Sequence, residues 1–125
     1  MGYIKHNAVV VTNWDEKELK AAHQKAKEVF ADAKFNFKNG KRLVSEIVYG
    51  IVNSQCSFFI APDGSKEGWG DSTNGDEARK EFQDWLLKNE NFSDYIEVRF
   101  GGDDEYNTVI RSKDTDLNEL SENSR

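Results

Sequence analysis

The chain has 125 residues, a length typical of one domain. It contains 17 Lys or Arg and 23 Asp or Glu, and the resulting net charge of −6 argues against a dedicated DNA-binding protein. A single cysteine excludes an internal disulfide, and no apolar run approaches the roughly 20 residues of a membrane-spanning helix. We therefore expect a cytoplasmic protein that contacts no membrane.

Charge is distributed unevenly along the chain. Residues 1–42 contain nine Lys or Arg and five Asp or Glu, a net charge of +4, whereas residues 43–125 contain eight and eighteen, a net charge of −10. Such a split can orient an approaching partner or favour head-to-tail self-association, so a homo-oligomer stays open. The simpler interpretation is a lysine-rich helix face beside acidic loops.

The first third of the chain predicts a strand followed by a helix. Residues 4–12 include the apolar run 8–11, whose β-branched residues indicate a central strand that is buried on both faces. Apolar residues then recur every three or four positions over residues 15–33. This spacing predicts a helix, with Thr12 or Asn13 as its cap.

The middle of the chain predicts a strand, a turn and a second helix. Residues 43–52 are rich in β-branched residues without clean alternation, so we expect an irregular strand or an extended loop there. A strand is expected over residues 56–61, and Pro62-Asp63-Gly64 ends it in a tight turn. The glycine-rich loop that follows is typical of a binding rim on a sheet. A helix over residues 76–89 should begin at a capping box and carry Arg79 on its outer side.

The last third predicts an antiparallel hairpin and a polar tail. Residues 95–100 alternate, and residues 106–111 return after a glycine-rich turn. The side chains expected to face the core are Ile96, Val98 and Phe100. The side chains expected to face outward are Tyr95, Glu97 and Arg99. Residues 112–125 have few apolar residues, so we expect a disordered or loosely ordered tail.

Together these elements predict an α+β domain over residues 1–111, with a flexible tail over residues 112–125. The order is strand, helix, one or two strands, helix and hairpin. It favours a mainly antiparallel sheet with two helices packed on one face. The second face of the sheet is then either covered or the binding surface.

The sequence indicates no cofactor and no metal site. His6, His23 and Cys56 lack the spacing of metal ligands. Cys56 opens an apolar strand, so we expect a buried and inert thiol. No catalytic residue is assigned, although one alternative is a small hydrolase in which His6 acts with a nearby carboxylate.

Three separated blocks of the sequence are more specific. They are residues 1–14 (MGYIKHNAVVVTNW), 57–69 (SFFIAPDGSKEGW) and 95–104 (YIEVRFGGDD), about a third of the chain. In these blocks the chain resembles a family of small proteins encoded by tailed bacteriophages and prophages. The resemblance implies an accessory protein in the cytoplasm of the bacterial host, and it carries over no catalytic residue.

Small acidic phage proteins commonly inhibit a host protein or sequester a signalling molecule. The resemblance therefore implies a non-catalytic, counter-defence binding protein that sequesters a small anionic or nucleotide-derived ligand. A host protein is the alternative partner, including one bound by acidic mimicry of DNA, whereas direct binding of nucleic acid is not expected. Such a ligand calls for aromatic stacking and cationic donors. The candidate ligand-binding residues are His6, Trp14, Lys66, Trp69 and Arg99.

Overall fold

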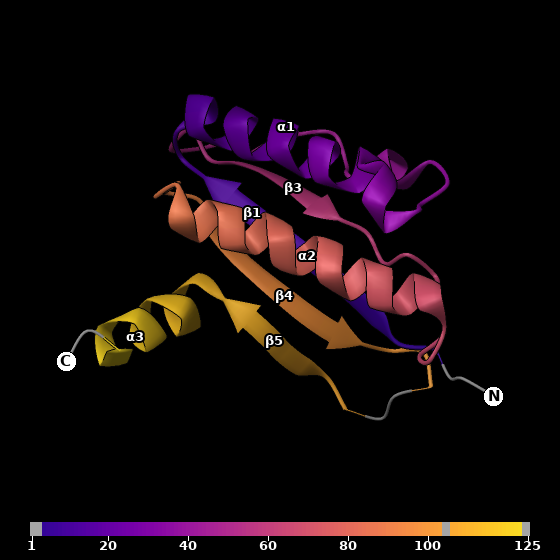
Figure 1. Ribbon diagram of the computed structural model, residues 1–125. Coiled ribbons are helices and arrows are strands. Elements are labelled where there is room, and N and C mark those ends of the chain that lie inside the picture. The colour runs from indigo at the N-terminus through magenta and orange to yellow at the C-terminus, as the bar shows by residue number, and fades with distance from the viewer. Residues whose placement is uncertain (1–3, 104–105, 124–125) are drawn as a thin grey trace.

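The computed structural model describes residues 4–103 and 106–123. Its elements are β1 (His6–Asn13), α1 (Glu16–Ala31), the short 3-10 helices η1 (Ala33–Phe35) and η2 (Gly40–Leu43), β2 (Val48–Tyr49), β3 (Cys56–Ile60), α2 (Gly70–Lys88), β4 (Asp94–Phe100), β5 (Thr108–Ser112) and α3 (Lys113–Asn123). The strands form one antiparallel sheet in the order β2-β3-β1-β4-β5. Helices α1 and α2 cover one face, and α3 lies at the β5 edge (Figure 1). The predicted fold class is confirmed.

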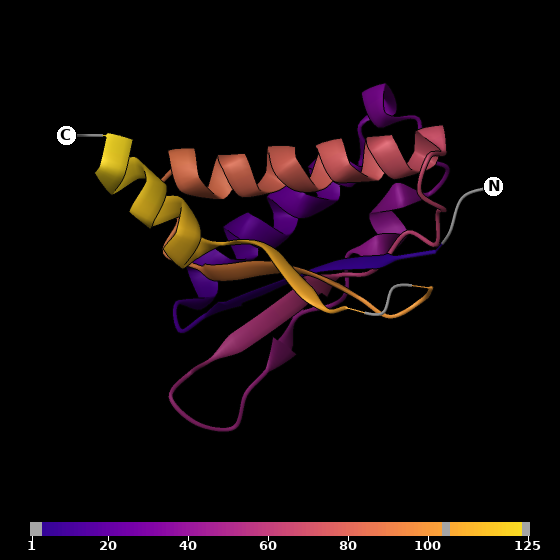
Figure 2. The same ribbon diagram turned by 90° about the horizontal axis from the view of Figure 1, so that it is seen from below.

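Strand β1 lies at the centre of the sheet, as its apolar run predicts. Val9 and Val11 face the helices and are completely buried. Val10 points to the other face, where it pairs with Phe59 of β3 and Ile96 of β4. No helix among the described residues covers that second face, where Val10 is 41% exposed, although Ala8 on the same face is only 6% exposed (Figure 2).

Helix α1 begins later than predicted. Its cap is Asp15, whose Oδ1 accepts hydrogen bonds from the amides of Lys17 (3.0 Å) and Glu18 (3.3 Å). Asn13 is still part of β1, and its side-chain amide donates to the Ser93 hydroxyl at 3.0 Å. The strand therefore retains the residue that the sequence indicated as a cap.

Helix α2 is longer than predicted and begins at Gly70 rather than at residue 76. The added first turns are rich in weak helix formers, but Ser72 and Gly75 are buried in them. A side chain at Gly75 would overlap the carboxylate of Asp63. Tertiary contact with the loop before the helix thus outweighs the low intrinsic propensity of this segment.

The predicted orientation of β4 is wrong. In the register with β1, Tyr95 lies opposite Val11 and Glu97 opposite Val9, so both side chains face the helices and are buried. The apolar side chains Ile96, Val98 and Phe100 therefore face the uncovered side. The polar face of β4 is tolerated under the helices because buried partners on α2, described below, bind its charged group.

Two further segments are residues 43–52, for which the sequence left a strand or a loop open, and residues 112–125, for which it predicted a disordered or loosely ordered tail. Within residues 43–52, only Val48–Tyr49 form a strand, β2, which pairs with the first residues of β3. The described part of the polar tail is helical and forms α3, whose first turn is capped where Ser112 Oγ accepts the Thr115 amide (3.2 Å). None of the described helices is long and apolar enough to cross a lipid bilayer.

Candidate functional site

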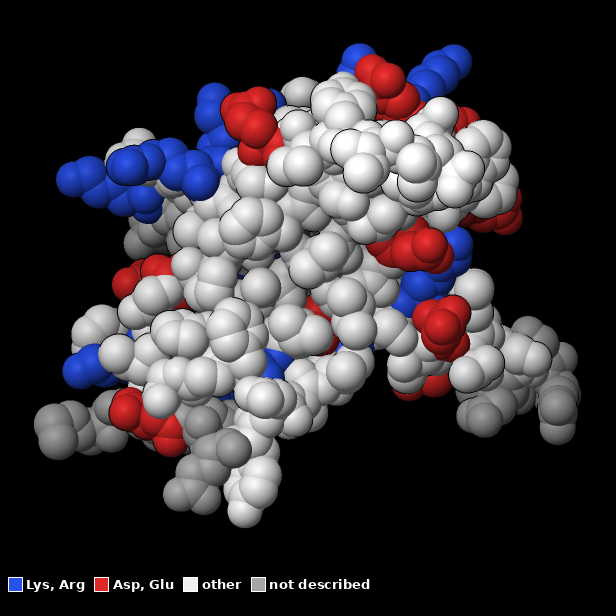
Figure 3. Space-filling view, turned by 180° about the vertical axis from the view of Figure 1, so that it is seen from behind, with Lys and Arg blue, Asp and Glu red and all other residues white. Residues whose placement is uncertain are grey.

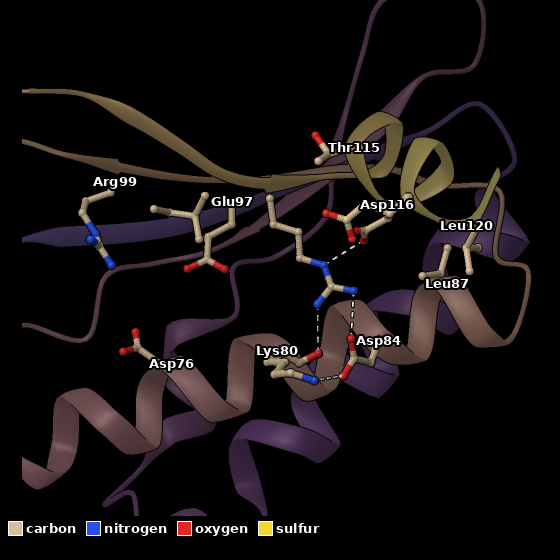
Figure 4. A pocket seen from close by; sticks show the side chains of 12 residues that line it. Asp76, Lys80, Asp84, Leu87, Glu97, Arg99, Thr115, Asp116 and Leu120 are labelled. Atoms are coloured by element: carbon tan, nitrogen blue, oxygen red, sulfur yellow. Dashed lines mark hydrogen bonds and ion pairs between the residues drawn. The ribbon is translucent and has the colours of Figure 1, made fainter. Parts of the chain in front are cut away.

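A cleft of about 640 Å³ lies between helix α2 and strands β4 and β5, with α3 at one end (Figure 4). Its walls carry charged side chains of both signs from α2, β4, β5 and α3. Leu87, Ile110 and Leu120 add an apolar surface. The volume falls in the range of about 300–1,000 Å³ that is typical of small-molecule sites.

A buried ion cluster centred on Arg79 of α2 supports one side of the cleft. Only 4% of this side chain is exposed. Its Nε lies 3.0 Å from Oε2 of Glu97 on β4, and a second nitrogen bonds Asp76 on the same helix. Its third nitrogen lies 3.6 Å from Oδ2 of Asp63, which is an ion pair but too long for a hydrogen bond. Arg79 thus ties the loop before α2 to the sheet.

The carboxylate of Glu97 is fully engaged in this cluster. Besides the bond from Arg79, Oε2 accepts the side-chain amide of Asn7 at 2.9 Å. Oε1 accepts Gln83 Nε2, also at 2.9 Å. With both oxygens bound by fixed donors, Glu97 is suited to holding α2 on the sheet rather than to accepting a proton from a substrate.

A second ion cluster joins β5, α2 and α3. Arg111 on β5 contacts Asp84 on α2 at 2.8 Å and Asp116 on α3 at 2.7 Å, and Asp84 also binds Lys80 at 2.7 Å. Burial by itself lowers the pKa of Arg111, but its bonds to Asp116 and Asp84 outweigh burial and raise it. For Asp84, burial acts to raise the pKa, and the bonds from Lys80 and Arg111 lower it overall. Both groups are therefore held in their charged forms.

Tyr95 extends this cluster into the core. Its hydroxyl donates a hydrogen bond to Asp116 Oδ2. Burial, followed by that bond, raises the pKa of Tyr95 well above its ordinary value of 10.0. The interaction anchors α3 on the helix-covered side of β4.

Arg99 differs from the other cations of the cleft. No ion pair joins it to a carboxylate within residues 4–103 and 106–123, and its buried Nε has no hydrogen-bond partner. Figure 4 shows the side chain extending from β4 into the space above α2. Burying part of a guanidinium without a partner is unfavourable, typically by about 1–3 kcal/mol. An anion in the cleft would satisfy this group.

The structure separates the other candidate residues. Lys66 Nζ lies 5.6 Å from the centre of the Trp69 ring, and this cation–π pair stands at the start of α2. His6 lies on the uncovered side of the sheet, where its ring packs against Phe100 with 5.5 Å between the ring centres. Trp14 follows the opposite end of β1 and is exposed. The five residues therefore do not line one pocket, and among them Arg99 alone lines the cleft.

The arrangement gives little support to the alternative of a hydrolase built on His6. Glu97 on the neighbouring strand β4 faces the helices, whereas His6 faces the other side. Within the described ranges, no hydrogen bond joins His6 to a carboxylate, and no group of three or more His, Cys, Asp or Glu is placed to hold a metal ion. The Cys56 thiol is buried as predicted, and burial raises its pKa, which disfavours the reactive thiolate.

Sequence reasoning missed the Arg79 cluster, although one signal was present. Gly75, Arg79, Phe82 and Leu86 recur at helical spacing and are all buried. Placing Arg79 on that stripe would have predicted a buried cation and hence a buried carboxylate. The contrary expectation, an outward Arg79, is wrong because three carboxylates surround it.

Comparison with known proteins does not extend these observations. No protein-family model matches the chain, and no match was found among the curated proteins. The assignment of function therefore depends on the geometry of the cleft.

Proposed function

We propose that the chain is a non-catalytic binding protein whose cleft takes up a small anionic ligand of nucleotide-like character. The observation that carries this proposal is the unpartnered, buried Nε of Arg99 on the cleft wall. A guanidinium presents donors in a planar fork that matches the geometry of a phosphate or carboxylate. Arg99 would hold the anionic group, and the rest of the ligand would lie along the cleft.

The other walls are compatible with such a ligand. Four of the five carboxylates that line the cleft, Asp76, Asp84, Glu97 and Asp116, are each bound to Arg79, Lys80 or Arg111, so they are largely neutralised. The fifth, Glu119, lies on α3 and is exposed to solvent. Leu87, Ile110 and Leu120 would contact an apolar or aromatic part of the ligand. In a phage protein, uptake of this kind would lower the concentration of a nucleotide-derived signal in the host.

A thermal-shift screen tests the proposal. The panel contains inorganic pyrophosphate, ADP-ribose derivatives and cyclic dinucleotides. A ligand at 100 times its dissociation constant should stabilise the protein by about 2.7 kcal/mol. This corresponds to several degrees in a domain of this size. Recovery of the intact ligand after heat denaturation would separate binding from turnover.

Two arginine variants identify the site. Arg99→Gln should abolish the shift, because it removes the unpaired guanidinium from the cleft. Arg42→Gln is the matched control, since it removes the same charge from an exposed position on η2. No shift across the panel, or an equal shift in wild type and Arg99→Gln, would reject the cleft as an anion site.

A further inference from the structure

The face of the sheet opposite α1 and α2 is apolar and uncovered. Its exposed apolar residues include Val10 at 41%, Phe59 at 44%, Phe100 at 40% and Val109 at 55%. Cross-strand pairs make the surface continuous, because Val10 pairs with Phe59 and Ile96, and Val98 pairs with Val109. We term this surface the open face, and it consists of Val10, Phe59, Ile96, Val98, Phe100 and Val109.

The centre of the open face lacks the polar side chains that solvent requires, and the polar residues of this side, such as His6, Thr12 and Asp94, lie toward the strand ends. An antiparallel sheet with one solvated face normally alternates between apolar residues inside and polar residues outside. Here Val9 and Val10 are adjacent and apolar, although only Val9 is under the helices. Seen from this side, uncharged side chains form most of the centre, and most charged atoms lie toward the outline (Figure 3). A continuous apolar patch of this kind marks an interaction surface.

The β2–β3 hairpin adds a second apolar surface beside the open face. Figure 2 shows it extending beyond the sheet on the side away from the helices. Its tip carries Ile51, which is 99% exposed, and Val52, which is 66% exposed. The hairpin is closed by a hydrogen bond of 2.7 Å from the Gly50 amide to the Gln55 carbonyl. Because the tip of this hydrogen-bonded hairpin is apolar and exposed, the hairpin is suited to contact another molecule.

We propose that the open face and the hairpin form a two-fold interface with a second copy of this chain. A two-fold axis brings the same patch of both copies together, so a patch must be complementary to itself. None of the six residues of the open face is charged, which means that two copies meet there without like-charge contacts. Asp94 lies on the same side at the start of β4, and its carboxylate is 3.6 Å from Lys113 of its own chain.

The dimensions of the sheet fit this partner. The five strands contain 27 residues, and at about 3.3 Å per residue and about 4.8 Å between strands they give a face of roughly 430 Å². Stacking two such faces would bury roughly 900 Å² in total, and each hairpin reaching over its partner would bring the interface above the lower bound of about 1,000 Å² for specific complexes. The inference does not depend on the anion site, because the cleft lies on the helix-covered side of the sheet.

Sedimentation velocity over a wide concentration range tests the proposal. The wild-type chain should sediment with twice the mass of one chain. Val10→Lys and Phe59→Lys should raise the dimer dissociation constant by at least about tenfold, because an ammonium group would be buried against an apolar surface. Phe92→Lys is the matched control, since Phe92 is an exposed aromatic residue in the loop before β4, and it should leave the dimer unchanged.

A hairpin variant keeps the test valid if the sheet variants fold poorly. Ile51 is almost completely exposed, so Ile51→Lys cannot disturb the fold of a single copy, yet it should weaken the dimer. A wild-type chain that stays monomeric at the highest concentration would overturn the proposal, as would a dimer that all three variants retain. Arg99→Gln should remain dimeric, which separates this interface from the anion site.

Discussion

Replacing Arg79 by methionine should destabilise the fold more than any surface substitution on α2. Methionine keeps much of the length of the side chain and removes the guanidinium that Glu97, Asp63 and Asp76 share. Glu97 is the critical partner, because its side chain is only 8% exposed. In the variant its charge would be held by the neutral amides of Asn7 and Gln83 alone.

The expected loss follows from this geometry. Removing one partner of a buried ion pair typically costs about 3–5 kcal/mol, because the other charge is left uncompensated. Asp76 is half exposed and can be solvated, so the loss of its partner adds little to the loss of stability. A loss of this size is a large part of the roughly 5–15 kcal/mol that stabilises a typical domain. It corresponds to a decrease in melting temperature of roughly 10–20 °C.

Urea denaturation provides the measurement. The midpoint should fall while the slope of the free energy of unfolding against urea stays constant. Lys80→Met is the control on the same helix, because it removes an exposed ion pair worth at most about 1 kcal/mol. Adding Glu97→Gln to Arg79→Met should recover part of the stability, since it removes the uncompensated charge. Equal midpoints for the Arg79 and Lys80 variants would refute the importance of the buried cluster.

Two further substitutions test individual contacts. Gly75→Ala should destabilise the protein by about 1–3 kcal/mol, because the added methyl group displaces the Asp63 carboxylate. Gly70→Ala is the control in the same helix: its methyl group meets open space, so it should be neutral or stabilising. Thermal unfolding of the two variants checks this, and equal changes in stability would contradict it. The raised pKa of Tyr95 stabilises the fold fully below pH 10, and this contribution is lost as the pH rises further, because the unfolded chain then ionises first. Tyr95→Phe should therefore cost about 1–2 kcal/mol at pH 7 and approach wild-type stability above pH 10. If the difference in stability between wild type and Tyr95→Phe does not change with pH, the hydroxyl is not the source of that difference.

Much of the fold can be predicted from apolar periodicity alone. The β-branched run of β1 and the stripe of α1 identify a central strand and a helix, and both are present. The orientation of β4 could not be predicted in this way, because both of its faces carry residues that are suitable for a core. Its polar face lies inside because Arg79 and Gln83, on the preceding helix α2, supply donors for Glu97.

The candidate site was less accessible to sequence reasoning. Arg99 lines the cleft, but on the face opposite to the one predicted for it. Lys66 and Trp69 form a local pair that their spacing of three residues allows. Whether side chains from β1, β4 and α2 share a pocket depends on register and sheet order. Neither the register of the strands nor their order in the sheet follows from a single sequence in which both faces of a strand are suitable for a core.

The central position of β1 has a consequence for how the chain acquires its structure. Asn7 and its partner Glu97 are separated by 90 residues, so this contact closes one of the longest loops available to the chain. Sheets held by such distant pairs fold slowly, because the loop entropy is lost before the contacts form. During synthesis, β1 is made before the other strands of the sheet and keeps one edge unpaired until Asp94–Phe100 follow. A nascent chain that stops before residue 94 therefore presents Val9, Val10 and Val11 along a bare strand edge, an arrangement that promotes aggregation.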